Sequence, residues 1–183
     1  MSLLLVDEIQ NLKGSTILNS SGSTLQVENT NTIGCTNEIS TTSSSFVSTG
    51  LSVSIVPTLK TSKLLVQWSG TVKSTNSSSN EDGIALRIYR DDKPICISKT
   101  GYESDCLIYN NANSLEEYYA QATIEHLVDS ESLAKTTFTL YFANFWGGTS
   151  YISNYWGTNS FTVKEISAWT QLIQKEILEF LKH

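Results

Sequence analysis

The chain has 183 residues, enough for one domain with a sizeable core, and a formal net charge of −6. Charged residues make up 16% of the chain, against about 25% in ordinary soluble domains. Such a chain lacks the basic surface that neutralises phosphates, so we expect no binding to nucleic acid. No apolar run approaches the roughly 20 residues of a membrane helix, and Leu3–Val6 is too short for the apolar region of a signal peptide. We therefore expect neither membrane insertion nor export by the usual route.

Residues 1–44 are rich in Ser, Thr, Asn and Gly and contain few apolar residues. Two similar runs, Gly14–Leu18 and Gly22–Leu25, favour two short strands joined by a turn. The segment is too thin in apolar residues to fold alone. We interpret it as an extended N-terminal arm or short shaft that gains its structure from a partner, and the alternative is a flexible tail.

Residues 45–167 predict a series of strands, because apolar and polar residues alternate with a period of two. The turn at 90–94 predicts a hairpin whose second strand is Ile95–Ser98, whereas residues 101–117 are poorly patterned and predict a long loop. About eight strands with short turns favour an antiparallel β-sandwich of jelly-roll kind. The predicted inward-facing positions are Leu51, Val53, Ile55, Leu64, Val66, Trp68, Ile84, Leu86, Ile88, Ala120, Ala122, Ile124 and Val128.

The stretch from Phe138 to Ser167 is the densest in aromatic and β-branched residues and reads as three strands. Phe138, Leu140 and Phe142 occupy one face of the first strand, and Gly147-Gly148 favours a turn after it. We expect this block to form the centre of the sandwich.

Residues 168–183 have a different pattern, with apolar residues at three- and four-residue steps and no Gly or Pro. This pattern predicts a short C-terminal amphipathic helix. A helix of this length is marginal alone in water, so it needs a surface to pack against. We expect it to form the interface of a homotrimer through Trp169, Ile173, Ile177 and Phe180, and the alternatives are docking on another protein and packing on its own sandwich.

Residues for enzymatic or metal chemistry are sparse. His126 falls on the same side of its strand as Ala122 and Ile124, which favours a core or interface histidine, and the other histidine is the last residue. No ligand spacing for a metal or nucleophile motif is present, so we expect no enzyme, metal or cofactor. The cysteines are odd in number, at positions 35, 96 and 106, and favour assembly in a reducing cytoplasm. Cys96 lies between Ile95 and Ile97, which favours a buried reduced thiol, and a Cys96–Cys106 bond stays open.

Four aromatic residues surround two glycine turns in the last third of the domain: Trp146, Tyr151, Tyr155 and Trp156. Exposed rings of this kind stack on sugar faces. The same rings also fill cores and interfaces, and we favour that second reading.

Several phrases resemble structural proteins of tailed phages, especially phages of cyanobacteria and marine bacteria. The opening LLLVDEIQNLKGSTILNSSGSTL is similar to their N-termini. The runs STTSSSFVSTGLSVSIVPTLKTSKLLVQWSGTV, IALRIYRDDKPI and FTVKEIS resemble a tail-fibre-type β-sandwich domain of the same phages. The helix after Ser167 departs from that pattern.

The resemblance implies a virion structural protein, and trimeric sandwiches are common in that class. It leaves two functions open. The first is a homotrimeric capsid-decorating protein, a cement protein or head knob, bound to the major capsid protein. The second is a tail fibre or short fibre, bound to tail proteins, that contacts glycans on the host surface. In both cases we expect the protein on the outer surface of the virion, assembled in the host cytoplasm.

Overall fold

The computed structural model describes residues 9–10, 16–18, 24–32, 38–75, 82–95, 106–110, 117–145, 147–153 and 158–167, and these residues form strands and connecting turns without a helix. The strands are β1 (Ile9–Gln10), β2 (Thr16–Leu18), β3 (Thr24–Thr32), β4 (Ile39–Thr41), β5 (Val47–Ile55), β6 (Lys63–Thr75), β7 (Asp82–Arg90), β8 (Lys93–Pro94), β9 (Cys106–Asn110), β10 (Glu117–Asp129), β11 (Thr136–Asn144), β12 (Thr149–Ser153) and β13 (Asn159–Ile166).

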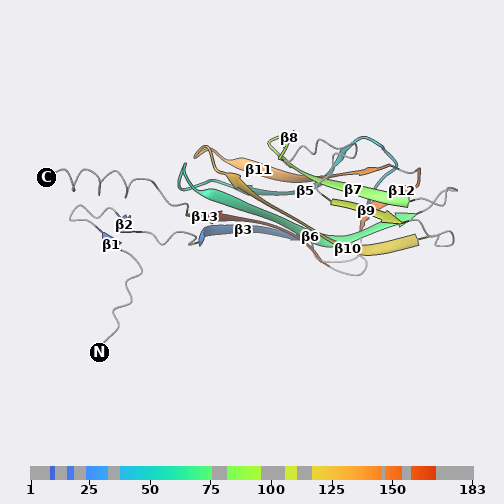
Figure 1. Cartoon of the computed structure of the whole chain (residues 1–183), viewed down its shortest axis with the longest axis horizontal. Helices are drawn as coiled ribbons and strands as arrows, with labels where there is room; N and C mark the ends of the chain where they lie inside the picture. Colours follow the sequence, from blue (N-terminus) through green and yellow to red (C-terminus); the bar gives the residue numbers. More distant parts are fainter. Residues whose placement is uncertain are drawn as a thin grey trace, which may run out of the picture.

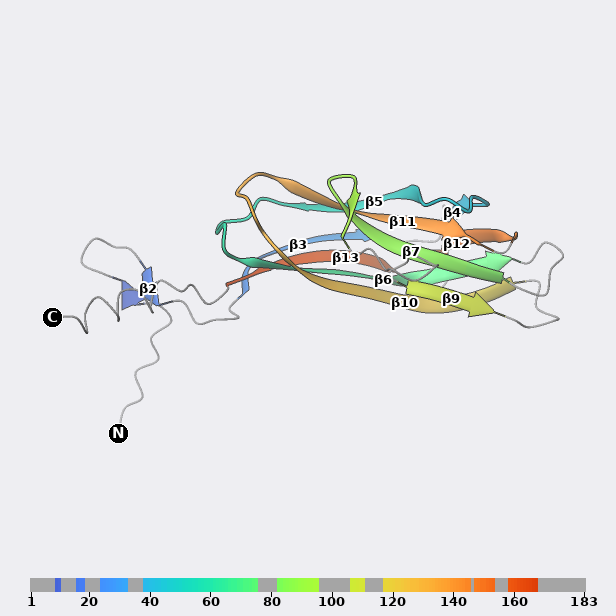
Figure 2. The same ribbon diagram turned by 45° about the horizontal axis from the view of Figure 1, so that its top comes forward.

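Two antiparallel sheets face each other and form the sandwich (Figures 1 and 2). In the six-stranded sheet, β6 pairs along its whole length with β10, and its other edge pairs first with β13 and then with β12. Strands β3 and β4 extend this sheet beyond β13 and β12. In the five-stranded sheet the order is β5–β11–β7, and the far edge of β7 pairs with β8 and β9. The expected mainly β, antiparallel architecture is therefore confirmed.

The chain changes sheet at most of its connections. It passes from β4 in the six-stranded sheet to β5 in the five-stranded sheet, returns to β6, and crosses again to β7. The same exchange recurs from β9 through β10 and β11 to β12. Strands that follow one another in sequence therefore often face each other across the core.

The core consists of inward-facing side chains from both sheets. Trp68 and Phe138 are fully buried, and the period of two places Leu64 and Val66 on the same face as Trp68. The predicted core positions of β6, β7 and β11 are confirmed. The buried apolar cluster comprises Val53, Ile55, Leu64, Val66, Trp68, Val72, Ile84, Leu86, Ile88, Ala122, Ile124, Phe138, Leu140, Phe142, Ile152, Phe161 and Val163.

The first and last strands of the sandwich meet at one end. Thr24 at the start of β3 pairs with Ile166 at the end of β13, and Lys63 and Asp129 lie at the same end. We call this end the terminal pole (left in Figure 1) and the opposite end, where β6 ends and β10 begins, the distal pole.

The predicted boundary between arm and sandwich needs correction. β3 and β4 lie within residues 1–44, yet both are members of the six-stranded sheet, so the sandwich begins at Thr24. The predicted hairpin between the runs 14–18 and 22–25 is also wrong. β2 pairs with β1 upstream, and β3 pairs with β13. Local pattern marked these strands but not their partners, and the partner of β3 is the last strand of the sandwich, far away in sequence.

Two findings concern the segment after β7. The hairpin turn is confirmed, and β8 at Lys93–Pro94 pairs back onto β7, whereas residues 96–98 of the expected strand Ile95–Ser98 lie outside the described residues. The long loop expected at 101–117 contains β9, which pairs with the first half of β7.

The expectations for residues 168–183, including Trp169, Ile173, Ile177 and Phe180, fall outside the described residues. The same holds for Trp146, Tyr155, Trp156, Cys35 and Cys96. Cys106 lies half-buried on β9. Because Cys96 is outside the described residues, the bond between these two cysteines stays a prediction.

Candidate functional site

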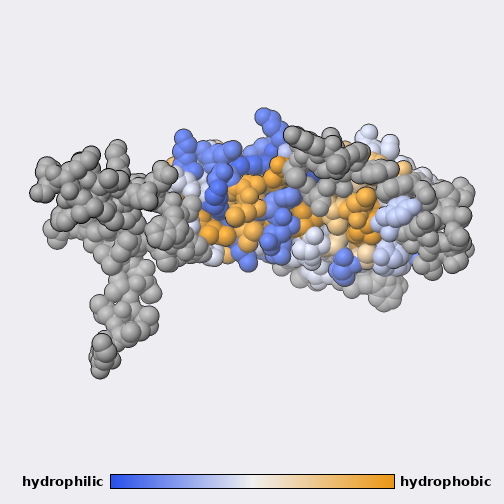
Figure 3. Space-filling view, in the orientation of Figure 1, coloured by the Kyte–Doolittle hydropathy of each residue, from blue (hydrophilic) through white to orange (hydrophobic). Residues whose placement is uncertain are grey.

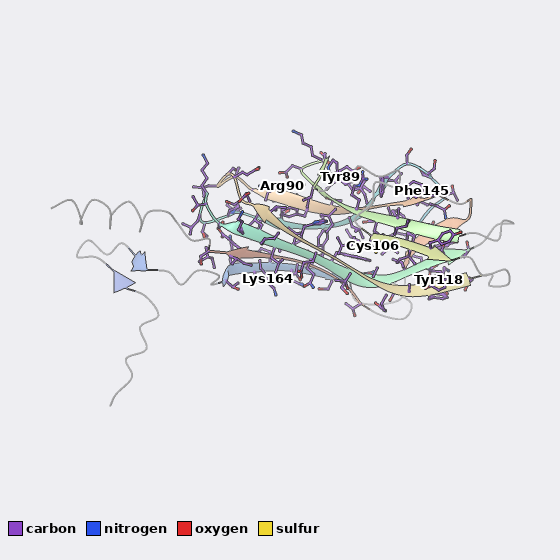
Figure 4. The ribbon with its side chains drawn as sticks, viewed as in Figure 1. Tyr89, Arg90, Cys106, Tyr118, Phe145 and Lys164 are labelled. Atoms are coloured by element: carbon purple, nitrogen blue, oxygen red, sulfur yellow. The ribbon has the colours of Figure 1, made fainter. Side chains whose placement is uncertain are left out.

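Two tyrosines flank a lysine on the outer face of the six-stranded sheet. In the sheet register, Lys73 of β6 lies between Tyr119 of β10 and Tyr151 of β12. All three side chains point away from the core, because Val72 and Ser74 on either side of Lys73 face inward. We call Tyr119, Lys73 and Tyr151 the lysine–tyrosine row. It lies towards the distal pole, where Figure 4 labels the adjacent Tyr118.

Contacts on several sides fix the ammonium group of Lys73. Its Nζ lies 3.0 Å from Glu38 Oε2 and 3.7 Å from Glu117 Oε1. It also lies 4.2 Å from the centre of the Tyr151 ring and 5.8 Å from that of Tyr119. Only 8% of Lys73 is exposed. Paired charge and aromatic faces together hold a buried lysine in one position.

These contacts keep the Lys73 side chain protonated and hold it in place. Burial alone lowers the pKa of Lys73, but the hydrogen bond and charge of Glu38 outweigh it, so the pKa is raised. The Tyr119 hydroxyl donates to Glu117 Oε2 over 3.1 Å, and burial together with this bond raises the pKa of Tyr119. A lysine that stays protonated is no general base, so the row suits binding rather than proton transfer.

Tyr119 is the most exposed member of the row, with 38% of its surface exposed, whereas Tyr151 is half-buried. Of the four aromatics predicted to face a ligand, Tyr151 is described, and it lies in this row under the ammonium group of Lys73. Alternation within β6 and β10 places Lys73 and Tyr119 on outer faces. Their contact depends on a register between strands far apart in sequence, which the sequence alone did not reveal.

A second polar cluster, centred on Glu165, lies at the terminal pole. Glu165 is completely buried on the inner face of β13, in line with Phe161 and Val163. Its carboxylate accepts hydrogen bonds from the backbone amides of Thr58 and Leu59. It also accepts bonds from the side chains of Thr58, Ser62 and Gln26, at distances of 2.6–2.9 Å.

This carboxylate ties three parts of the chain together. Burial alone raises the pKa of Glu165, but the bonds from Ser62, Thr58, Leu59 and Gln26 outweigh it, and the pKa is lowered. Gln26 also donates to Val56 O, so β3 is joined to the β5–β6 loop. The Glu165 cluster therefore stabilises the pole at which both ends of the sandwich emerge.

The other candidates among the described residues are a histidine, metal-ligating side chains and a cavity, and each lies in or beside the packed core or lacks the ligands for a metal. His126 lies on the core side of β10 with Ala122 and Ile124, as the alternation predicted. Among the described residues, no group of three or more His, Cys, Asp or Glu side chains is placed to hold a metal ion. A cavity of about 10 Å³ beside Trp68 and Asn159 has room for about one water molecule.

Across the described ranges, no helix is long and apolar enough to cross a membrane. Comparison of the sequence with models of known protein families and with curated proteins gives no match.

Proposed function

We propose that the chain is a non-enzymatic structural protein of a phage virion surface, a homotrimer that decorates the capsid as a cement protein or head knob. The observation that carries this proposal is the pairing of Thr24 with Ile166. The residues before β3 and after β13 leave the sandwich side by side at the terminal pole. Attachment through that pole leaves the distal pole free to face outward, which suits a protein fixed to a shell.

We infer a sandwich of jelly-roll kind, in which each sheet has four strand positions and the chain passes between the sheets at successive strands. In the six-stranded sheet, β13 and β12 share one position beside β6, and β3 and β4 share the next. The orders β3/β4–β13/β12–β6–β10 and β5–β11–β7–β9 support this fold, as does the repeated change of sheet between β4 and β12.

The trimer is proposed to form through the C-terminal segment. An amphipathic helix over 168–183 has its apolar stripe at Trp169, Ile173, Ile177 and Phe180, and three copies around an axis cover that stripe. The segment starts at the terminal pole, directly after β13, so the proposed axis passes close to that pole.

The number of copies per particle tests the virion role. Quantitative mass spectrometry of purified particles that carry the chain compares its amount with that of the major capsid protein. Head decoration predicts hundreds of copies, in a number divisible by three. A few dozen copies or fewer support a tail location, and absence from particles contradicts both functions.

The exposed Tyr119 beside a fixed lysine favours one alternative, a fibre that contacts glycans on the host surface. A rigid ring with neighbouring carboxylates and a lysine offers a stacking face and hydrogen-bond partners for sugar hydroxyls. Because Lys73 is already paired with Glu38 and Glu117, the row suits a neutral sugar better than an acidic one.

Binding to an array of neutral oligosaccharides distinguishes the two functions. If the alternative holds, the chain binds some of them, Tyr119→Ala abolishes the signal, and Tyr109→Ala does not. Tyr109 is a matched control, because it is 44% exposed on β9 and belongs to the other sheet. If the capsid role holds, neither the chain nor its variants give a signal.

A further inference from the structure

A row of apolar side chains crosses the outer face of the six-stranded sheet near the terminal pole. In the register, Val27 of β3 neighbours Lys164 of β13, Lys164 neighbours Leu65 of β6, and Leu65 neighbours Leu127 of β10. Val27 is 51% exposed and Leu127 is 60% exposed, while Leu65 is half-buried. We call Val27, Leu65 and Leu127 the apolar row.

The apolar row stands out from its surroundings on the same face. The next row towards the distal pole is polar and consists of Asn29, Thr162, Gln67 and Glu125. On the other side, Lys63 and Asp129 form an ion pair across 2.5 Å, next to the half-buried Ile166. Figure 3 likewise shows apolar (orange) surface near the terminal pole. Cross-strand neighbours of this kind form a strip across the sheet, in which Lys164 separates Val27 from the adjacent pair Leu65 and Leu127.

The position of the strip indicates what covers it. Lys164 in the row lies on β13, four residues before residues 168–183 begin, which is roughly 13 Å at about 3.3 Å per residue. Residues 168–183 must reverse direction to lie over the strip of their own chain. A neighbouring copy that is joined through those residues brings its sandwich alongside the same pole without such a reversal.

Charges in and beside the row fit a contact between copies. Lys164 is basic and lies within the row between Val27 and Leu65, whereas Glu125 is acidic and lies beside Leu127 on β10, in the neighbouring polar row. A trimer uses one surface of each copy against a different surface of the next, so the basic side of this region in one copy can meet the acidic side in another. Glu125 and Asp129 also flank Leu127 on edge strand β10, and charged residues at a sheet edge disfavour strand addition.

We infer that the apolar row is the part of the sandwich surface on which a second copy of this chain packs. The inference rests on the proposed trimer, and it assigns part of the interface to the sandwich as well as to residues 168–183. The contact is made by side chains of the outer face.

The test measures the mass of the intact chain by light scattering over a range of micromolar concentrations. Leu127→Lys puts a charge in the row at an exposed position, and Val27→Lys does so at its other end. Leu107→Lys is the control, an exposed leucine (39%) on β9 of the other sheet. We expect both row variants to dissociate at concentrations at least tenfold higher than the wild type, and the control to match the wild type.

The outcomes separate this inference from the proposal beneath it. A trimeric wild type that neither row variant weakens overturns the inference and leaves the trimer standing. A wild type of single-chain mass overturns the trimer and the inference with it. Row variants that lower the melting temperature without changing the mass also overturn it, because the row is then covered within one chain. Circular dichroism confirms that each variant keeps its β-structure.

Discussion

At the scale of single residues, Glu165 has the clearest effect on stability. A buried carboxylate is costly unless hydrogen bonds satisfy it, and here five donors do so. Glu165→Gln keeps the shape but presents an amide N–H group to some of those donors. We expect it to lower the free energy of unfolding by about 2–3 kcal/mol, as for a buried hydrogen-bonded charge. Urea denaturation measures the change.

Glu28→Gln is the control for this variant, since Glu28 is an exposed glutamate on β3. Surface changes of this kind usually alter stability by less than about 0.5 kcal/mol. If both variants shift the unfolding midpoint equally, the Glu165 cluster does not stabilise the terminal pole as described.

The same carboxylate predicts a pH dependence. Its pKa in the folded chain is lower than its ordinary value of 4.5, so the unfolded state binds the proton more readily. The stabilisation by Glu165 is fully present well above pH 4.5 and is lost as the pH falls through the folded pKa. We expect the difference in unfolding free energy between wild type and Glu165→Gln to shrink below that pH. A constant difference down to strongly acid pH contradicts the assignment.

The sequence carries a signal for part of this chemistry, although the strand pattern did not single out Glu165. Glu165 has the same parity as Phe161 and Val163, so alternation in FTVKEIS places a charged residue at an inward position. Its donors come from Gln26 and the β5–β6 loop, more than a hundred residues away, and no local pattern identifies them. Gly70 is similar, because a Cβ there would lie 1.8 Å from Asn159 Oδ1, a closeness that only the fold creates.

At the scale of elements, the β7–β8 hairpin is held by both its turn and its neighbours. Asp91 and Asp92 have φ angles of 47° and 67°, the left-handed conformation of a two-residue hairpin turn. The Asp91 carboxylate accepts bonds from Thr136 Oγ1 and the Thr137 amide. Next to it, the Arg90 guanidinium donates to the carbonyl groups of Asp129 and Ser130.

We expect Arg90→Lys to destabilise the fold by about 1.5–3 kcal/mol, since a lysine cannot reproduce the fork that binds several oxygens at once. Hydrogen exchange at residues 130–136 should quicken. Glu131→Gln removes only the exposed ion pair of 3.5 Å to Arg90 and should change stability by less than about 1 kcal/mol. If Glu131→Gln costs as much as Arg90→Lys, the ion pair holds the loop and the carbonyl contacts do not.

Strands could be predicted where apolar and polar residues alternate strongly. They could not be predicted where a strand forms only because it pairs with a neighbouring strand. The strands that contain Trp68, Ile88 and Phe138 were predicted correctly, because apolar and polar residues alternate along them. β9 is short, lies in a polar stretch and exists because it pairs with β7. β3 has an irregular, polar inward face, so the sequence resembled an arm although the strand completes the six-stranded sheet.

At the scale of the whole molecule, the two poles differ in character. The terminal pole gathers the Glu165 cluster, the apolar row and both exits of the chain, whereas the lysine–tyrosine row lies towards the distal pole. We therefore expect loss of residues 168–183 to impair assembly and leave the sandwich folded. A chain ending at Ser167 should keep its β-type circular dichroism but lose its trimer or melt at a lower temperature. A truncated chain that is still trimeric and equally stable rules out the proposed helical interface.

The measurement that tests the central claim most directly is the molar mass of the intact purified chain, taken by light scattering at micromolar concentration. One chain has a mass of 20.2 kDa. A structural trimer predicts three times that mass, unchanged on moderate dilution. A stable mass of a single chain over the same range contradicts the proposed homotrimer.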